Sequence, residues 1–356
     1  MTKMINSQML FDFDAENRSM TKMINSDIKK KNVAKLTLGG LFAGIGGIEL
    51  GFKKVGFDIS WANEIDKNAA VTYKANHTHK LFEKDLKDLK TSEVDKIDIL
   101  TGGFPCQAFS VAGHRKGFED DRGNLFFEIL RFVDDLEPKI IFLENVKNLQ
   151  GHDKGNTFKR ILKELEGRGF HVKNKVLNSA EYGNTPQNRE RIYIVAFKDK
   201  KVFDNFEFPK PKKLTKKIAD LIDNEAEEKF YYTNSRYYKQ LKEEMKNRDT
   251  IYQWRRVYVR ENKSKLCPTL TANMGTGGHN VPLIIDNKDI RKLTPRECAR
   301  FQGYDDSFIL SDKLANSHIY KQIGNSVTVP VIEAIAKKIK EALKYGWKWI
   351  STRTNR

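Results

Sequence analysis

The feature that most restricts the fold of this chain is a series of short apolar runs separated by helical segments. Residues 97–100 form one run, which ends at Gly102 and Gly103, and residues 140–143 form another, which ends at Glu144. Apolar runs of this length between turn residues are typical of buried strands. Strands that alternate with helices predict an α/β fold with a doubly wound, mostly parallel sheet. Ligands bind such sheets at the carboxyl ends of the strands, so the residues after each run are candidate site residues.

The first apolar run leads into a glycine-rich turn. Residues 36–42 are followed by Gly44 and Gly46, then by a helical segment, and then by a second strand that ends at Glu64. Such a turn lets the backbone approach a ligand closely, and an acid about 20 residues later binds ribose hydroxyls, so this unit predicts an adenosine-binding site. The dinucleotide pattern has a third glycine where Glu49 stands, which makes NAD binding the weaker alternative.

Cys106 lies at the tip of the strand at 97–100, directly after Pro105. The thiolate is the reactive form of cysteine, whose free pKa is about 8.5. Exposed N–H groups at the strand tip and the cations between His114 and Arg122 favour the anion, which predicts a nucleophile. The alternative is an inert buried cysteine. We expect no metal, because Phe109 stands where the zinc pattern Pro-Cys-x-x-Cys needs its second cysteine.

Composition narrows the compartment and the partner. The 356 residues include three cysteines, and the net charge is +17, from 64 Lys and Arg against 47 Asp and Glu. A sparse, odd set of cysteines indicates a reducing compartment, so we expect a cytoplasmic protein. The apolar runs are too short to span a membrane, and no signal peptide is evident. The charge suits a polyanion such as nucleic acid, although a generally lysine-rich surface would give the same total.

The texture of the sequence divides the chain into four parts. Residues 1–7 recur unchanged at 20–26, which indicates a duplicated start or a cloning remnant rather than a functional arm. The four parts are a flexible extension at 1–34, a sheet domain at 35–199 plus 326–345, a smaller loop-rich module at 200–325 and a basic tail at 346–356.

The smaller module mixes aromatic and basic side chains ahead of a glycine-rich tract at 274–279. These side chains are Tyr231, Tyr232, Tyr237, Tyr238, Tyr252, Trp254, Arg255, Arg256, Tyr258 and Arg260. Such interleaving is often only a solvated face, but beside a glycine-rich loop it favours a DNA-binding surface.

Six tracts stand in the order found in the DNA (cytosine-5) methyltransferases, and from about residue 36 to 343 the chain resembles the compact bacterial members of restriction-modification systems. The tracts are Phe42-Ala43-Gly44-Ile45-Gly46-Gly47, Gly103-Phe104-Pro105-Cys106-Gln107-Ala108-Phe109-Ser110, Glu144-Asn145-Val146, Gln187-Asn188-Arg189-Glu190-Arg191, Arg291-Lys292-Leu293-Thr294-Pro295-Arg296-Glu297-Cys298 and Gly324-Asn325-Ser326-Val327. The resemblance implies methyl transfer from S-adenosylmethionine to C5 of cytosine in a specific sequence of double-stranded DNA. It makes the sheet domain the catalytic and S-adenosylmethionine-binding domain, and residues 200–325 the target-recognition domain.

The resemblance also implies the catalytic roles. Cys106 would add to C6 of a cytosine flipped out of the helix, as a covalent catalyst. Glu144 would hydrogen-bond N3 and the exocyclic amine, which requires a pKa raised by burial. Arg189, with Arg191, would hold the base O2 and position Glu144. The alternative for Glu144 and Arg189 is a structural ion pair.

For the methyl donor, the resemblance assigns Phe42 to the adenine face, Glu64 to the ribose hydroxyls, Asp85 to the adenine amine and Asn325 to the amino-acid end. Ile65 stands where relatives often have an aromatic residue, so we expect looser adenine packing. The full predicted cofactor set is Phe42, Ala43, Gly44, Gly46, Gly47, Glu64, Ile65, Asp85, Leu86, Gly103, Pro105, Leu125, Asn325 and Val327.

The resemblance implies a mobile loop at 111–122 that closes over the site, and a set of DNA contacts. Gln107 and Ser110 would meet the flipped nucleotide, and Arg122 and Thr269 would meet phosphates. The predicted contacts of the recognition region are Arg255, Arg256, Gly277 and Gly278. The sequence does not predict which DNA sequence is read, because base readout depends on loop side chains.

Two other functions stay open. Methylation of tRNA on the same scaffold is disfavoured by the aromatic-basic module, since reading duplex DNA needs loops that reach a groove. A DNA-binding module without catalysis is disfavoured by the intact Cys106, Glu144 and Arg189. We expect a monomer that associates with the bacterial nucleoid through DNA, and a cognate restriction endonuclease as genetic partner.

Overall fold

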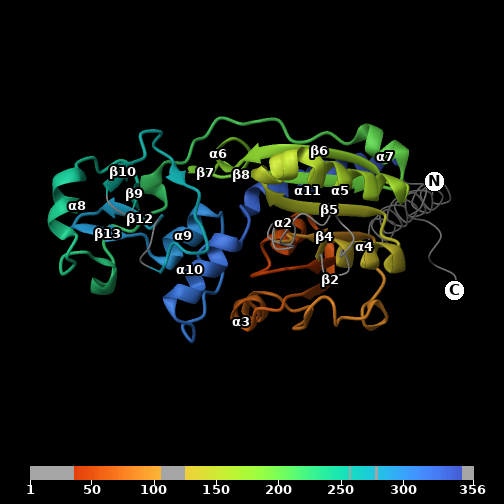
Figure 1. Cartoon of the computed structure of the whole chain (residues 1–356), viewed down its shortest axis with the longest axis horizontal. Coiled ribbons are helices and arrows are strands. Elements are labelled where there is room, and N and C mark those ends of the chain that lie inside the picture. Colours follow the sequence, from red (N-terminus) through yellow and green to blue (C-terminus); the bar gives the residue numbers. More distant parts are fainter. Residues whose placement is uncertain (1–35, 106–124, 256–257, 277–279, 347–356) are drawn as a thin grey trace, which may run out of the picture. The chain divides into compact units, whose positions relative to one another are not determined.

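The larger sheet of the fold has seven strands in the order β3-β2-β1-β4-β5-β8-β6. Figure 1 labels β2, β4, β5, β6 and β8 among them. The computed structural model describes residues 36–105, 125–255, 258–276 and 280–346. The strands are β1 Thr37–Leu41, β2 Asp58–Asn63, β3 Lys80–Phe82, β4 Ile99–Gly102, β5 Ile140–Val146, β6 His171–Asn178 and β8 Glu190–Phe197. The neighbours from β3 to β5 pair in parallel, and β8 runs antiparallel to both β5 and β6. The predicted mostly parallel α/β sheet is therefore confirmed.

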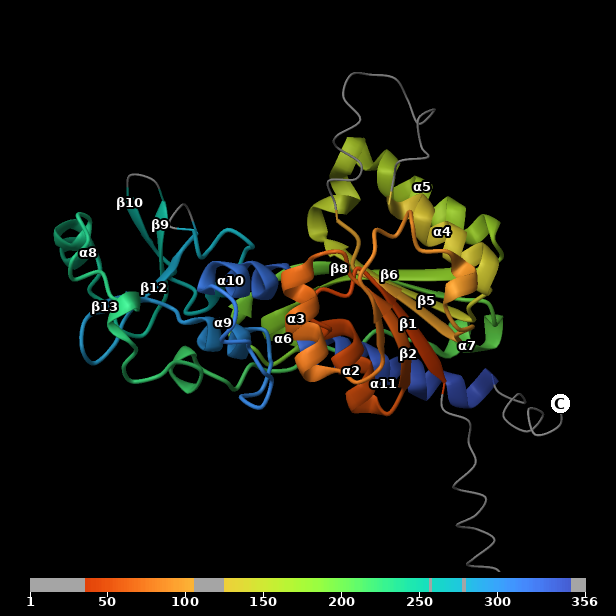
Figure 2. The ribbon, with the colours of Figure 1, turned by 90° about the horizontal axis from the view of Figure 1, so that it is seen from below.

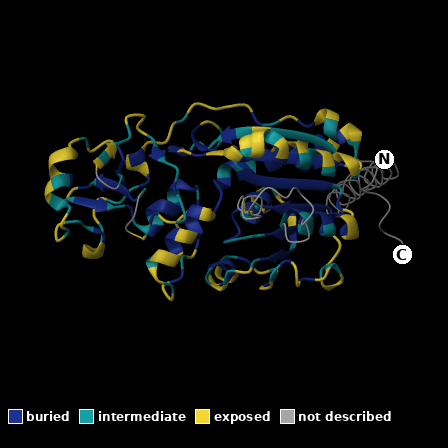
Figure 3. Cartoon of the chain, in the orientation of Figure 1, coloured by how far each residue is buried: buried dark blue, intermediate teal, exposed yellow. Residues whose placement is uncertain are grey.

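Helices cover both faces of this sheet. The helices that follow or precede its strands are α2 Gly47–Val55, α3 Lys67–Asn76, α4 Leu125–Leu136, α5 Asn156–Gly167, α6 Ser179–Tyr182, α7 Lys200–Asn205 and α11 Val329–Gly346. Figure 2 shows α4 and α5 on one face and α2 and α11 on the other. The middle strands of the sheet are buried between them, and β5, buried at all but its last residue, is dark blue in Figure 3.

The C-terminal helix α11 packs on α2. Gly51 of α2 makes the close approach possible, because a Cβ built there would lie 2.6 Å from the Cβ of Ile332. Within the described residues, none of the helices is long and apolar enough to cross a bilayer.

A second, antiparallel sheet has the order β10-β9-β12-β13. Its strands are β9 Tyr252–Arg255, β10 Tyr258–Glu261, β12 Pro282–Ile285 and β13 Ile290–Lys292, and the helices near it are α8 Tyr238–Glu244, α9 Pro295–Phe301 and α10 Asn316–Asn325. A short parallel pair, β7 Gln187–Asn188 and β11 Cys267–Pro268, joins the two regions of the chain. These elements all fall within one compact unit, Leu36–Gly346, so the predicted domain boundaries stay predictions.

The structure corrects part of the predicted DNA-binding surface. Tyr252 and Trp254 are buried in the core of the second sheet, where Tyr237 packs on Trp254 with ring centroids 4.7 Å apart. Strand residues two apart share a face, and here that face covers the core rather than solvent. Tyr258, on β10, is 53% exposed and stays a surface residue. The predicted extension at 1–34 and residues 347–356 of the predicted tail lie outside the described residues.

Candidate active site

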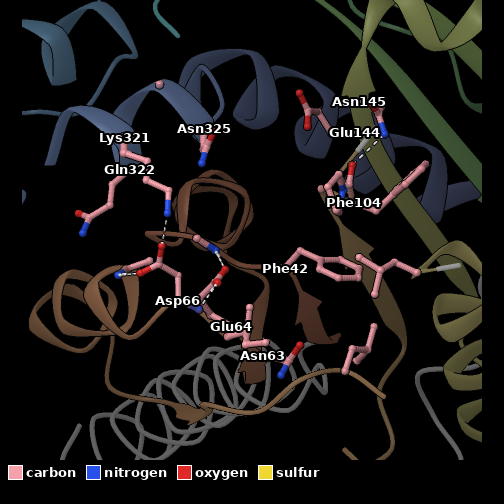
Figure 4. A pocket seen from close by; sticks show the side chains of 18 of the residues that line it. Phe42, Asn63, Glu64, Asp66, Phe104, Glu144, Asn145, Lys321, Gln322 and Asn325 are labelled. Atoms are coloured by element: carbon pink, nitrogen blue, oxygen red, sulfur yellow. Dashed lines mark hydrogen bonds and ion pairs between the residues drawn. The ribbon is translucent and has the colours of Figure 1, made fainter. Parts of the chain in front are cut away.

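A cavity of about 600 Å³ lies where β1, β2, β4 and β5 end (Figure 4). The carboxyl ends of four parallel strands meet there, which is the edge that the sequence predicts for a ligand. Its lining is Phe42, Gly44, Asn63, Glu64, Ile65, Asp66, Ala69, Lys84, Asp85, Leu86, Gly103, Phe104, Pro105, Leu125, Glu144, Asn145, Val146, Arg189, Arg191, Lys321, Gln322, Gly324 and Asn325.

Most of the predicted cofactor residues therefore meet at one cavity, but four do not line it. Ala43 donates its N–H to the carbonyl of Asn63 and ties the ends of β1 and β2 together. Gly46 and Gly47 start α2, and Val327 is buried. Gly46 has φ 84°, and a Cβ there would lie 2.0 Å from Nε2 of His77, so this position needs glycine.

Glu64 is held in one orientation by two backbone N–H groups. Its Oε2 accepts from Gly44 at 2.7 Å, and its Oε1 accepts from Asp66 at 2.7 Å (Figure 4). A carboxylate has about four acceptor positions, so lone pairs remain for further donors. A fixed carboxylate beside a glycine turn suits a pair of ribose hydroxyls, which supports an adenosine ligand.

The neighbouring wall of the cavity is fixed by side chains that the sequence analysis did not identify. Asn63 donates to the carbonyls of Phe82 and Lys84, at 3.0 and 2.9 Å, and so holds the turn that carries Asp85 and Leu86. Asn63 stands directly before Glu64 at the end of a predicted strand, where site residues are expected. On the rim, Ile65 is 60% exposed.

Glu144 stands at the end of β5 with 8% of its surface exposed, and it pairs with an arginine. Arg191 Nε lies 3.1 Å from Glu144 Oε1, because the β5–β8 register sets Arg191 opposite Val146 and Tyr193 opposite Glu144. Burial raises the pKa of Glu144 above its usual value, although the two nearby arginines act in the opposite direction. The geometry therefore gives a buried carboxyl group that holds its proton more tightly than an exposed one does.

Arg189, which the sequence analysis placed first as the partner of Glu144, has other partners. Its guanidinium donates to the carbonyls of Leu270, at 2.8 Å, and Gly324, at 3.1 Å, and also to that of Ser326. These three carbonyls take up three of its four terminal N–H groups, and the direct contact with Glu144 is made by Arg191. Arg189 still lines the cavity and ties together segments that lie far apart in the chain.

The turn before the predicted nucleophile passes beside Glu144. A Cβ built on Gly103 would lie 3.5 Å from Glu144 Oε2, and Asn145 donates to the carbonyl of Phe104 at 2.9 Å. Asn145 thus fixes the turn that leads to Cys106, a role that the sequence analysis did not assign. The predicted loop at 111–122 and several predicted site residues lie outside the described residues, namely Cys106, Gln107, Ser110, Arg122, Arg256, Gly277 and Gly278.

Two predicted DNA contacts have protein partners in this structure. Thr269 donates its hydroxyl to the carbonyl of Asn188 at 2.7 Å, and Arg255 donates to Oδ1 of Asn280 at 2.5 Å. Their roles toward DNA stay predictions. The described ranges contain no group of three or more His, Cys, Asp or Glu side chains placed to hold a metal ion.

The chain is similar to proteins of one family. The model of the C-5 cytosine-specific DNA methylase family matches residues 36–341. The chain is 56% identical over 314 residues to type II methyltransferase M.Bsp6I of Bacillus sp. (strain RFL6), covering 86% of this chain and 99% of the relative. It is 38% identical over 334 residues to type II methyltransferase M.HhaI of Haemophilus parahaemolyticus, covering 90% and 98%.

Solved structures of lower identity share the fold. The S. pombe Dnmt2 methyltransferase matches with a TM-score of 0.69 at 21% identity, over 87% of this chain and all of that one. A putative DNA modification methyltransferase encoded within an E. coli prophage matches with a TM-score of 0.63 at 22% identity, again over 87% of this chain.

Proposed function

Because this chain belongs to the C-5 cytosine-specific DNA methylase family and is a DNA (cytosine-5) methyltransferase, we propose that it methylates cytosine within a specific sequence of double-stranded DNA, with S-adenosylmethionine as donor. The observation that carries the proposal is the buried Glu144–Arg191 pair, which faces the same cavity as the glycine turn and Glu64. A base activator and an adenosine site within one cavity suit a transfer between a nucleobase and an adenosine-containing donor.

The residues of the cavity fit the methyl donor. S-adenosylmethionine, when bound, supplies an electrophilic methyl group on a sulfonium centre. Glu64, already oriented by two N–H groups, would accept from the ribose hydroxyls. Phe42 and the exposed side chain of Ile65 would pack on the adenine, Asp85 would accept from its amine, and Asn325 would bind the amino-acid end.

Glu144 would activate the base. Cytosine C5 is a weak nucleophile, and it becomes reactive when C6 is attacked while N3 receives a hydrogen bond. The pKa of Glu144 is raised by burial, so the carboxyl can hold the proton that it would donate at N3. Arg191, which fixes one carboxylate oxygen of Glu144, would bind O2 of the base.

Cys106 would form the covalent bond. Its thiolate would add to C6, C5 would then take the methyl group, and loss of the C5 proton with release of the sulfur would restore the aromatic ring. This chemistry needs a cytosine flipped out of the helix, which Gln107 and Ser110 would assist. The names of the relatives point to a restriction-modification system, so we propose a cognate endonuclease as genetic partner and DNA as the partner in the cell.

The test is covalent trapping on duplex DNA that contains 5-fluorocytosine, with S-adenosylmethionine present. Fluorine at C5 cannot leave as a proton does, so the wild-type chain should form a stable adduct in a methylated complex, and Cys106→Ala should form none. A wild-type chain that methylates duplex DNA without forming the adduct would overturn the role of Cys106. Methyl label that appears only in tRNA would overturn the choice of DNA.

Glu144→Gln tests the base activator separately. The amide keeps the shape and loses the acidic proton, and we expect kcat to fall by on the order of 10² or more with the Kd for DNA unchanged. In the wild type the raised pKa of Glu144 predicts that kcat falls as the pH rises through that pKa, because the reactive form is protonated. A Glu144→Gln variant with wild-type kcat would contradict the assignment.

A further inference from the structure

Two walls of the donor cavity come from opposite ends of the chain and meet across it. One wall is the start of α3 with the residues before it, and the other is the end of α10. Lys321 of α10 reaches across, and its Nζ lies 2.8 Å from Oδ2 of Asp66 (Figure 4). No tract of the sequence signals this contact, because 255 positions separate the two residues.

Asp66 links Lys321 to Glu64, the residue proposed to bind the ribose hydroxyls. Its Oδ1 caps α3 by accepting from the N–H groups of Asn68, at 2.9 Å, and Ala69, at 3.3 Å. Its own N–H donates to Oε1 of Glu64 at 2.7 Å, and the other oxygen of Glu64 accepts from Gly44. A displacement of Asp66 would therefore turn the carboxylate of Glu64 away from the glycine loop.

The charges favour the same arrangement. Glu64 and Asp66 place two carboxylates two positions apart, and Lys321 contacts the second of them, Asp66. Partial burial acts to raise the pKa of Asp66, but Lys321 and the N–H groups at the start of α3 outweigh it and lower that pKa. Asp66 is thereby kept ionised and attached to Lys321.

The docking of the two helices does not depend on this ion pair. Thr72 of α3 and Gln322 of α10 form a buried hydrogen bond of 2.8 Å, and Asn68 lies 3.3 Å from the ring nitrogen of His318. The Lys321 and Asp66 side chains are 52% and 29% exposed. Ion pairs that exposed contribute at most about 1 kcal/mol to stability, so the pair has little value as a fold contact.

We propose that Lys321 is a positioning residue for the methyl donor, holding Asp66 and through it the carboxylate of Glu64 in the orientation that the ribose hydroxyls require. This inference rests on the proposed function. Lys321 acts through Asp66, so the same contact gives α10 a part in donor binding beyond that predicted for Asn325.

The test compares binding of S-adenosylhomocysteine to the full chain by titration calorimetry. Lys321→Met should weaken binding about fivefold, the amount that one partly exposed ion pair supplies. Asp66→Asn, which keeps the cap of α3, should weaken it similarly, and the double variant should be no weaker than Lys321→Met alone. The KM for S-adenosylmethionine should rise with Lys321→Met while kcat at saturating donor stays within about twofold, and Lys321→Arg should restore binding.

Lys337→Met is the matched control. Lys337 pairs with Glu333 on α11, and the two side chains are 57% and 26% exposed, nearly the same as in the Lys321–Asp66 pair. We expect this variant to bind within twofold of the wild type. The inference would be overturned if Lys321→Met bound S-adenosylhomocysteine as tightly as the wild type, or if the losses of the two single variants added in the double variant. It would also be overturned if circular dichroism showed that Lys321→Met had lost its fold. A wild-type chain that neither binds the nucleoside nor methylates DNA would instead overturn the proposed function.

Discussion

Two arginines of the described chain are almost completely buried, and their surroundings are opposite. Arg291, in the second sheet, is fully buried between two carboxylates, with Nε 2.5 Å from Asp286 and Nη2 2.7 Å from Glu297. Arg189, at the donor cavity, is 2% exposed and donates only to backbone carbonyls. The same side chain is thus neutralised by contact in one region and not in the other.

The difference separates an arginine whose charge is paired from one whose charge is not. Although burial acts to lower the pKa of Arg291, Glu297 and Asp286 raise it above its usual value, and these two carboxylates neutralise its positive charge. Burial lowers the pKa of Arg189 to about 9, partly against the attraction of Glu144. A buried cation without a contacting anion costs stability, and such costs are typical of functional sites. We infer that Arg189 keeps the cavity positive beside Glu144, where a polyanion and a carbonyl oxygen of the base are expected.

Arg291→Met should give the largest effect. Removal of the guanidinium leaves Asp286 and Glu297 buried without their cation, which costs about 3–5 kcal/mol of unfolding free energy. Urea denaturation followed by circular dichroism measures it. Arg160→Met is the control, because Arg160 pairs with Glu164 one turn away at the surface and should cost less than about 1 kcal/mol. Equal losses in the two variants would show that the acids of the cluster are not held by Arg291.

Glu49→Gln extends the comparison to a buried acid without a cation. Glu49 is 1% exposed, its Oε2 has no hydrogen-bond partner among the described residues, and burial raises its pKa to about 8. The pKa of Glu49 in the unfolded chain is 4.5, so between pH 4.5 and 8 the folded chain keeps a proton that the unfolded chain releases. The stabilisation that this proton gives is complete below pH 4.5 and is lost as the pH rises towards 8. From pH 5 to pH 8 the free energy of unfolding of the wild type should fall by roughly 3 kcal/mol more than that of Glu49→Gln, as measured by urea denaturation.

The comparison of the two proteins isolates Glu49 from other buried groups. His77, beneath the glycine turn, has a pKa lowered to about 4 by burial, so it costs stability in acid rather than in base. That contribution is present in both proteins and cancels in the difference. Parallel pH profiles for the wild type and Glu49→Gln would mean that Glu49 is ionised in the folded state.

Some of the charged residues of the site could be predicted from the sequence, and others could not. Glu64 and Glu144 stand at the ends of predicted strands, where parallel strands bring site residues to one edge, whereas Asp85 and the role of Glu144 were predicted from the family resemblance. The choice between Arg189 and Arg191 was not predictable from spacing. Residues two apart share a face, and only the pairing of β8 with β5 decides which of them reaches Glu144.

Contacts between distant segments set the second limit. Neither Lys321 nor Asp66 carries a local signal, since their meeting depends on how α10 packs beside α3. Tyr252 and Trp254 have the composition of a nucleic-acid surface, yet tertiary packing buries them. Aromatic residues serve cores and stacking surfaces equally well, so composition alone could not separate the two.

Arg189→Met should give a smaller loss of stability than Arg291→Met and the sharpest test of the comparison. The substitution leaves the carbonyls of Leu270, Gly324 and Ser326 without their donor, and each unpaired neutral group costs about 1–3 kcal/mol. It also removes a buried cation that has no contacting anion, which offsets part of this cost, so the net loss of unfolding free energy should be smaller than for Arg291→Met. We also expect the activity to fall, because two of these carbonyls flank Asn325, which lines the proposed donor cavity. The kcat/KM for methylation of duplex DNA, measured where both the wild type and the variant are folded, gives the loss of activity.

Arg189→Lys keeps the charge but cannot reach three acceptors, so it should recover only part of the activity. If Arg189→Met instead destabilised the chain as much as Arg291→Met and left kcat/KM intact, the two arginines would both be structural, and the distinction drawn from their partners would fail.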